Sequence, residues 1–187
     1  MNKSLEKIIS ELIELFKPYL DGVESVLDVG TGTSIPIHVF AANFPEINYY
    51  TIDIADIRKK TDLPFILYNG KNLPFKNLEF DVAVLNETLH HCKEPEPVLT
   101  EAARTAKSVY LIEHFPKPGT SIKDLVKTEI SALKDFDIDC KYYKPFTEHS
   151  LYLLFEKAGL KINEKIEIPY HGNRRITKYF FKLTKST

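Results

Sequence analysis

The feature that most constrains this chain is an apolar segment that runs directly into two closely spaced glycines, VLDVGTGTS at residues 26–34. Glycine adopts positive φ without strain and carries no side chain, so backbone built this way can approach a ligand closely. Backbone amides at the start of a helix also point outward and attract polar groups. The stretch therefore predicts a buried strand, a ligand-binding turn at Gly30 and Gly32, and a helix capped by Thr33 or Ser34.

Strands and helices are predicted to alternate along most of the chain. The predicted strands are 24–29, 47–54, 65–68, 79–86, 108–115, 160–168 and 176–184, and the predicted helices are 4–16, 35–43, 95–107, 122–133 and 148–158. A further rudimentary helix is expected between the second and third strands. Buried strands in this order favour an α/β fold, a Rossmann-like doubly wound sheet that is mostly parallel with helices on both faces. The last two strands, joined by a turn, are expected to make its C-terminal end antiparallel, and a ligand is expected at the carboxyl ends of the parallel strands.

The length of 187 residues suggests a single domain spanning 1–187, with an N-terminal helix within 1–20 and a less regular segment at 115–150 that is a candidate substrate-lid insertion. Aromatic side chains gather in that segment between 136 and 146. They are interpreted as a substrate lid, as ordinary packing or as a dimer contact, and the sequence leaves these alternatives open.

The bulk composition excludes several classes of partner. The formal net charge of −1 gives no electrostatic argument for nucleic acid. The two cysteines, Cys92 and Cys140, form no CxxC, so neither a disulfide framework nor a metal site is predicted. No apolar run approaches the ~18 residues that a membrane span requires. A cytoplasmic protein without a membrane contact is therefore expected.

The spacing of the glycines also bears on the ligand. A nicotinamide dinucleotide fingerprint, GxGxxG, would need its third glycine where this chain has Ile35. That glycine allows the helix to pack closely beside the pyrophosphate, and its absence disfavours a nicotinamide oxidoreductase.

The stretch from Asp28 to Ser34, DVGTGTS, resembles the D/E-x-G-x-G-x-G loop of class I S-adenosylmethionine-dependent methyltransferases, with serine in place of the last glycine. Further stretches resemble the same family: NGKNLPF at 69–75, EFDVAV at 79–84, NETLHH at 86–91, and a helix with Glu101 and Arg104 in an L-x-E-x-x-R pattern. The resemblance is close over 23–115 and looser over 147–160. It is nearest to small-molecule methyltransferases such as those of quinone biosynthesis.

The resemblance implies S-adenosylmethionine as cofactor and a set of binding residues. The implied cofactor-binding residues are Asp28, Gly30, Gly32, Asp53, Asn69, Gly70 and Asn86. Asp53 ends the second strand, where a carboxylate can accept the ribose hydroxyls. Asn69 stands where the family usually has an acid that receives the adenine amino group, and Asn86 is expected near the methionine moiety. Asp28 is expected either to support the turn or to contact the ligand.

Candidate catalytic residues are weaker. His90, His91 and His114 can each exchange a proton near neutral pH, but a structural role is favoured for each of them. Glu87 and His149 are weaker candidates still. Because a sulfonium is already a strong methyl donor, alignment alone can suffice, and no base is assigned. A late basic cluster is interpreted as a solvated hairpin loop in preference to an anion site; it comprises Arg174, Arg175, Lys178 and Lys182.

Residues after the fourth strand disfavour nucleic-acid methyltransferases. The stretch from Asn86 to Leu89 lacks the prolines of exocyclic-amino DNA methyltransferases, and neither cysteine follows a proline, as a cytosine-C5 enzyme requires. A small-molecule acceptor is therefore predicted, with methyl transfer by aligned SN2 displacement. The alternative is a catalytically silent S-adenosylmethionine-binding partner or regulatory module. The complete glycine loop favours the enzyme.

Overall fold

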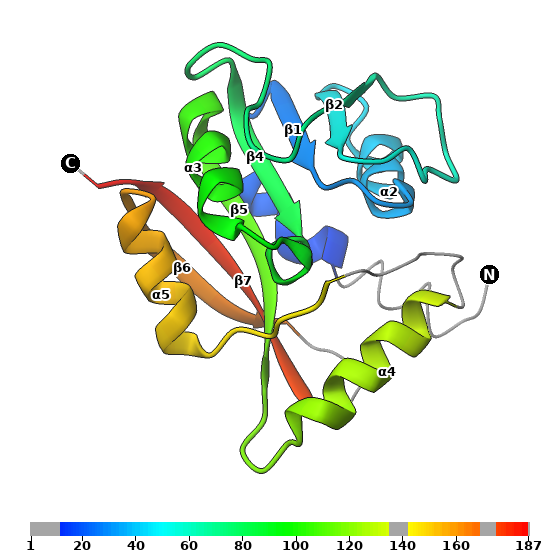
Figure 1. The fold of residues 1–187 in the computed structure, drawn as a ribbon. Coiled ribbons are helices and arrows are strands. Elements are labelled where there is room, and N and C mark those ends of the chain that lie inside the picture. The colour runs from blue at the N-terminus through cyan, green and yellow to red at the C-terminus, as the bar shows by residue number, and fades with distance from the viewer. Residues whose placement is uncertain (1–11, 135–141, 169–174, 187) are drawn as a thin grey trace.

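The computed structural model describes residues 12–134, 142–168 and 175–186. These residues form one seven-stranded sheet in the order β3-β2-β1-β4-β5-β7-β6 (Figure 1). The strands are β1 Ser25–Val29, β2 Asn48–Asp53, β3 Phe65–Leu67, β4 Phe80–Asn86, β5 Ala106–Pro116, β6 Leu160–Ile168 and β7 Ile176–Lys185. Neighbours from β3 to β5 run parallel, whereas β7 is antiparallel to both β5 and β6. The predicted fold class and its antiparallel end are confirmed.

The helices follow the predicted order. They are α2 Ile35–Asn43, α3 Pro95–Thr105, α4 Ile122–Lys134 and α5 Glu148–Lys157, with short 3₁₀ turns η1 Lys17–Tyr19 and η2 Leu89–His91. Of the predicted N-terminal helix, residues 12–16 are helical and 1–11 lie outside the described residues. Among the helices that the structure describes, none has both the length and the apolar character needed to cross a bilayer.

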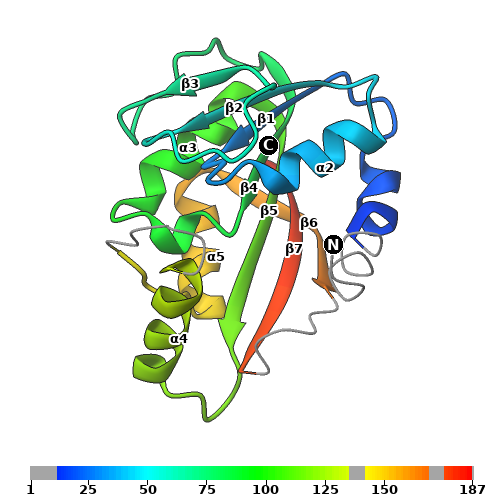
Figure 2. The same cartoon turned by 90° about the vertical axis from the view of Figure 1, so that its right-hand side faces the viewer.

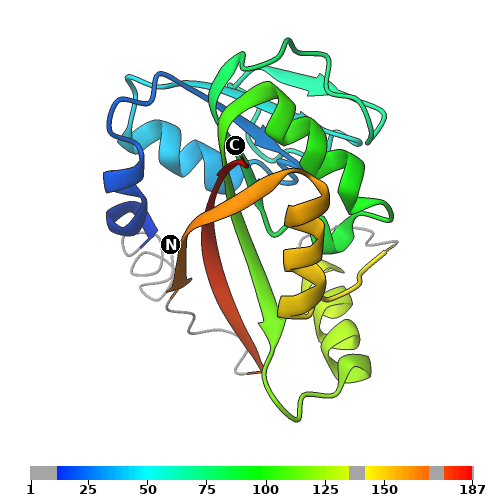
Figure 3. The ribbon, with the colours of Figure 1, turned by 90° about the vertical axis from the view of Figure 1, so that its left-hand side faces the viewer.

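The two faces of the sheet bury different side chains because residues along a strand alternate between them. Leu27 and Val29 of β1 belong to the cluster that contains Leu99 of α3 and Phe155 of α5. Val26 belongs to the opposite cluster, with side chains of α2 and of residues 12–20. Figure 2 shows α2 and residues 12–20 on one side of the sheet, and Figure 3 shows α3 and α5 on the other. Because β1, β2, β4 and β5 run parallel, their carboxyl ends lie along one edge of the sheet, between these two layers of helices.

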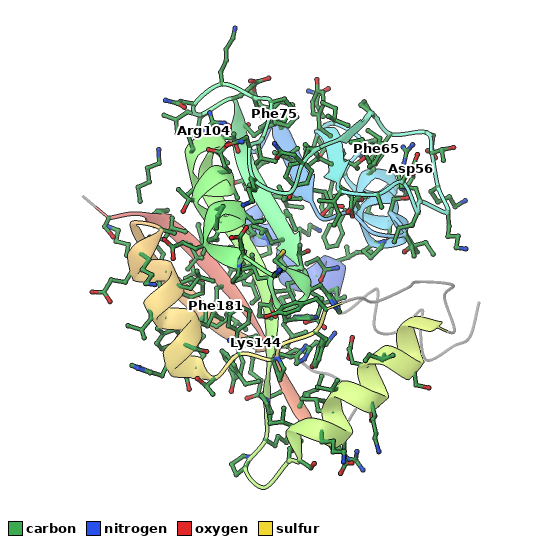
Figure 4. The ribbon with its side chains drawn as sticks, in the orientation of Figure 1. Asp56, Phe65, Phe75, Arg104, Lys144 and Phe181 are labelled. Atoms are coloured by element: carbon green, nitrogen blue, oxygen red, sulfur yellow. The ribbon has the colours of Figure 1, made fainter. Side chains whose placement is uncertain are left out.

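The segment between β2 and β3 contains no helix, so the rudimentary helix predicted there is wrong. Side-chain contacts hold this loop instead. Arg58 binds Asp56 through Nε at 2.8 Å, and its guanidinium lies 4.0 Å from the ring centre of Phe65. Figure 4 shows Asp56 and Phe65 on the same flank of the molecule. The loop also donates an amide hydrogen bond from Lys59 to the Thr33 carbonyl, so it packs against the glycine turn.

The Leu-Pro-Phe segment before β4 is fastened to α3 by two charged residues. Arg104 donates to the carbonyl oxygens of Leu73 at 3.0 Å and Phe75 at 2.8 Å. Glu101 accepts from the Leu73 amide at 2.8 Å and from Arg104 Nε at 2.7 Å. Figure 4 shows Phe75 and Arg104 together at the end of the sheet remote from Lys144. The pattern L-x-E-x-x-R is thus a clamp that holds a loop on a helix.

Candidate functional site

The glycine turn after β1 has the backbone that its sequence predicts. Gly30 and Gly32 have φ of 76° and 53°. The Gly30 amide donates to the Ile52 carbonyl of β2 at 2.8 Å. The Gly32 amide donates to Asp53 Oδ2, also at 2.8 Å. The turn is therefore fixed to the end of β2 by hydrogen bonds.

Ser34 does not cap α2 in the way that the sequence predicts. Its φ is 59°, in the left-handed region, and neither it nor Thr33 makes a side-chain cap to the helix. Ser34 Oγ instead donates to the Lys60 carbonyl at 2.6 Å. A cap residue normally has extended backbone that aims its side chain at the next amides, whereas this backbone aims it at the loop after β2. Ser34 thus replaces the last glycine of the loop pattern in its left-handed conformation.

Asp53 lies at the mouth of the glycine turn. In addition to Gly32, its carboxylate accepts from the Ile54 amide at 2.6 Å. Burial raises the pKa of Asp53, and the backbone hydrogen bonds act against that rise. The side chain remains partly accessible, so a carboxylate stands at the end of β2 where the ribose-binding acid is predicted.

Asp28 lies on the face of β1 that is covered by α2 and residues 12–20. It is only 6% exposed. Burial raises its pKa to about 7, and the charge of Asp53 acts in the same direction. A cavity of about 90 Å³, lined mainly by apolar side chains, brings Asp28, Gly30 and Asn86 together. Three predicted site residues from β1 and β4 therefore share one space.

Asn69 and Gly70 follow β3. Asn69 Oδ1 accepts from the amides of Lys71 at 2.8 Å and Asn72 at 2.9 Å, so the predicted adenine acceptor already closes a local turn. Gly70 has φ of 77°, and a side chain there would approach Ile54 Cγ2 at 3.2 Å. The loops after β2 and β3 therefore lie side by side.

A second group of polar side chains gathers after β4 and along the last part of β5. We call His90, His91, Glu113, His114 and Tyr143 the histidine cluster. His90 Nδ1 lies 2.6 Å from Glu113 Oε2, and Glu113 Oε1 accepts from the Leu89 amide at 2.9 Å. Neither His90 nor Glu113 is more than 1% exposed. Burial lowers the pKa of His90, but the charge and hydrogen bond of Glu113, together with the charges of Glu87 and Glu129, outweigh it, so the pKa is raised overall.

His114 connects the cluster to a partly buried ion pair. Its Nδ1 lies 3.2 Å from Glu87 Oε2, and its Nε2 lies 2.8 Å from the Tyr143 hydroxyl. Glu87 also pairs with Lys178 Nζ at 2.8 Å. Burial alone would raise the pKa of Glu87, but Lys178 and His114 together hold it well below its usual range.

The interpretation of the late basic residues as a solvated hairpin loop is wrong for two of them. Lys178 and Lys182 lie within β7, not in a loop. Lys178 is 18% exposed and neutralises Glu87, and Lys182 Nζ lies 5.5 Å from the ring centre of Tyr19. Arg174 lies outside the described residues.

His91 and the end of the aromatic segment complete the cluster. His91 Nδ1 lies 3.2 Å from the Tyr142 carbonyl oxygen. Burial, and then the positive charge of His90, lowers the pKa of His91 to about 4. The Lys144 amide donates to the His90 carbonyl at 2.9 Å, at the position labelled in Figure 4. Of the segment that was interpreted as a lid, residues 142–146 therefore cross the cluster, and 135–141, including Cys140, lie outside the described residues.

The structure thus brings the predicted residues together in two places. Cofactor candidates line the edge from β3 to β4, and the three histidine candidates meet where η2 lies against β5. His149, by contrast, is an exposed residue of α5. Sequence reasoning placed Tyr143 only within the aromatic segment at 136–146, and it gave no role to Glu113. The signal available for Glu113 was a carboxylate placed one residue before His114 in an apolar strand, where an unpaired charge is costly.

Comparison with known proteins supplies the family. The methyltransferase domain family matches residues 1–165. A methyltransferase of Bacillus halodurans has a TM-score of 0.66 at 15% identity, with 96% of this chain and 99% of that chain covered. A SAM-dependent methyltransferase of Methanosarcina mazei has a TM-score of 0.64 at 18% identity, with 91% and 96% covered. Both likenesses concern the fold.

One curated relative matches locally. An uncharacterized protein of Methanocaldococcus jannaschii is 34% identical over 55 residues, which are 29% of this chain and 27% of that protein. The match thus spans about a quarter of the relative's length. Because the family match covers most of the chain, this protein belongs to the methyltransferase domain family.

Proposed function

We propose that the protein transfers the methyl group of S-adenosylmethionine to a small-molecule acceptor held beside the histidine cluster, by in-line displacement. The observation that carries this proposal is the short segment after β4. Asn86 borders the same cavity as Asp28 and Gly30. Glu87 contacts His114, and Thr88 Oγ1 donates to the Val29 carbonyl at 3.2 Å. Three consecutive residues therefore join the glycine turn to the cluster.

The residues at the glycine turn fit the cofactor. Gly30 and Gly32 hold the left-handed backbone that a close approach requires, and Asp53 offers a carboxylate oxygen at the end of β2. We assign the binding set as predicted: Asp28, Gly30, Gly32, Asp53, Asn69, Gly70 and Asn86. Asn69 is the weakest member of this set because its amide oxygen already accepts two backbone amides.

When bound, S-adenosylmethionine supplies an electrophilic methyl group. The acceptor atom forms a bond to that methyl as the bond to sulfur breaks, and an acceptor hydroxyl, amine or thiol also loses one proton. The role of the protein is alignment, which by itself can supply a large part of the rate. His114 of the cluster and its partner Glu87, 3.2 Å apart, are placed to hold that proton. Tyr143 and its neighbours cover the acceptor side.

The net charge of −1 and the lack of a proline turn after Asn86 support a small acceptor over a nucleic acid. Incubation with labelled cofactor and fractionated cell extract tests this. We expect label in the low-molecular-mass fraction. Label that is found only in RNA, DNA or protein would refute the small-molecule acceptor while leaving the methyltransferase activity intact.

Calorimetric titration tests the cofactor site. We expect the protein to bind S-adenosylmethionine and S-adenosylhomocysteine but not NADH. Asp53→Ala is expected to weaken binding by about 1–3 kcal/mol through the loss of charged hydrogen bonds. Asp56→Ala is the matched control, because that carboxylate lies three residues further along and pairs with Arg58. Equal affinity of both variants and wild type would remove Asp53 from the site.

A further inference from the structure

We propose that His90, His91 and Glu129 bind one divalent transition-metal ion. One ligand atom from each of these residues lies within 4.8 Å of the others. The two histidines come from η2, and Glu129 comes from α4. Two imidazoles and one carboxylate are a ligand set that suits zinc and iron(II), and it is unsuited to magnesium or calcium, which take oxygen ligands.

The first argument is an orphaned nitrogen. His90 Nε2 is buried and has no hydrogen-bond partner among the residues that the structure describes. The His90 side chain as a whole is 1% exposed. A buried polar atom without a partner costs free energy, and native proteins rarely leave one unless a ligand, ion or water satisfies it. A metal ion can satisfy such a nitrogen, because a neutral imidazole nitrogen readily donates its lone pair to a metal.

The second argument is how the opposite nitrogens are held. His90 Nδ1 lies 2.6 Å from Glu113 Oε2, and His91 Nδ1 lies 3.2 Å from the Tyr142 carbonyl. Metal-ligating histidines typically donate their other ring N–H to a carboxylate or a backbone carbonyl, which fixes the tautomer and aims the ligand nitrogen. His90 has a carboxylate partner in Glu113, and His91 has a backbone carbonyl partner in Tyr142. Their surroundings are therefore those of oriented ligands.

A competing set of groups lies nearby, because His90, Glu113 and His114 also come within 4.8 Å of one another. The hydrogen bonds decide between the two sets. Glu113 uses one carboxylate oxygen for the Leu89 amide and the other for His90. His114 is bonded on both sides, by Glu87 and Tyr143. Glu113 and His114 are thus supporting groups, and Glu129 is the carboxylate left to coordinate.

The proposal goes beyond methyl transfer and does not depend on it. Three protein ligands leave at least one coordination position for water or another donor. Small rotations of His91 and Glu129, both only partly buried, bring their ligand atoms onto the ion that His90 holds.

Cobalt(II) titration of chelator-stripped protein tests the proposal, because bound cobalt reports its coordination through visible absorption. We expect wild type to bind one equivalent with the spectrum of a four- or five-coordinate ion, and zinc to displace it. Glu129→Gln is expected to weaken binding at least about tenfold. Asp124→Asn is the matched control, since this carboxylate lies on the same helix and is exposed. It should bind as wild type does.

Glu113→Gln provides a second variant, expected to weaken cobalt binding about 10–100-fold by releasing His90. S-Adenosylhomocysteine affinity of the same metal-free samples shows that each variant is folded and tests the methyltransferase site separately. The absence of saturable cobalt binding by wild type would overturn the proposal, and so would a Glu129→Gln affinity equal to that of Asp124→Asn. Neither result would bear on cofactor binding.

Discussion

Thr88 fills the space directly beside the α-carbon of Gly30, so that a methyl group on Gly30 would lie 2.3 Å from Thr88 Cγ2. Two different requirements therefore exclude a side chain at Gly30. Its φ of 76° disfavours any other residue, and the segment after β4 occupies the volume. Gly32 shares the first requirement only, because among the described residues no atom outside its two chain neighbours comes within 4 Å of a β-carbon placed there.

Gly30→Ala is expected to destabilise the protein by about 2–5 kcal/mol, the sum of left-handed backbone strain and overpacking. Gly32→Ala is expected to cost about 1–2 kcal/mol, from backbone strain alone. Denaturant unfolding of the two variants measures the difference. Equal destabilisation would contradict the role given to Thr88.

Thr88→Ala removes both atoms that lie closest to the added methyl group, although Thr88 Cβ at 3.2 Å remains. The double variant Gly30→Ala, Thr88→Ala is therefore expected to regain part of the lost stability, so the two changes are not additive. A double-mutant cycle of unfolding free energies shows this. Strict additivity would mean that the clash relaxes elsewhere.

The raised pKa of Asp28 predicts a pH-dependent stability. Its folded-state pKa of about 7 exceeds its ordinary value of 3.8, so the folded state keeps a proton that the unfolded chain releases. Stability from this group is complete below about pH 4 and is lost as the pH rises towards 7. Asp28→Asn should abolish this decline, so its advantage over wild type should grow between about pH 4 and 7 and then stay constant. Unfolding midpoints across this range measure it, and parallel profiles would contradict it.

The clamp between α3 and the Leu-Pro-Phe segment depends on the planar guanidinium of Arg104. Arg104→Lys keeps the charge but cannot reach both carbonyl oxygens and Glu101, and we expect it to cost about 1–3 kcal/mol. Glu94→Gln, which breaks an exposed pair with Lys71, should leave the unfolding midpoint unchanged. If Arg104→Lys behaves as this control does, the clamp contributes little to stability.

Lys178→Met is expected to raise the pKa of Glu87 and to destabilise the protein by about 1–3 kcal/mol, because a partly buried carboxylate loses its cation. Adding Glu87→Gln should restore part of that stability. Lys157→Met breaks the more exposed pair with Glu96 and is the control, for which no measurable effect is expected. If Lys178→Met is as stable as this control, the contact with His114 alone is enough to stabilise the Glu87 carboxylate.

Local sequence patterns predict most helices and strands of this fold. The features that they do not predict depend on contacts between residues far apart in the sequence. The strands were predictable because each buries a short apolar run between turn residues, and β1 and β4 match within one residue. The prediction that Ser34 caps α2 is wrong because the left-handed backbone of Ser34 is set by the glycine turn and by the contact with the loop at Lys60. β5 extends to Pro116 because it pairs there with Ile176, sixty residues later.

The candidate site divides in the same way. Asp53 and the two glycines were predictable because they lie at strand ends in a recognisable loop. The pairing of Glu87 with Lys178 joins the residue that follows β4 to β7, and no local signal distinguishes Lys178 from a surface lysine. The sequence singles out His90 as a candidate catalytic residue. That its Nε2 atom is buried without a hydrogen-bond partner among the described residues is seen only when Glu113 and α4 are placed around it in the structure.

The position of β7 between β5 and β6 has a consequence for how the protein is made. β5 ends at Pro116, but its neighbour begins only at Ile176, so a ribosome must produce α4, α5 and β6 before β5 gains its second partner. Until then β5 is an open strand edge that can pair with another nascent chain. During that interval Glu87 also lacks Lys178, the cation with which it pairs in the folded protein. Pausing translation between these two strands should therefore favour aggregation, and chaperone binding during synthesis should concentrate there.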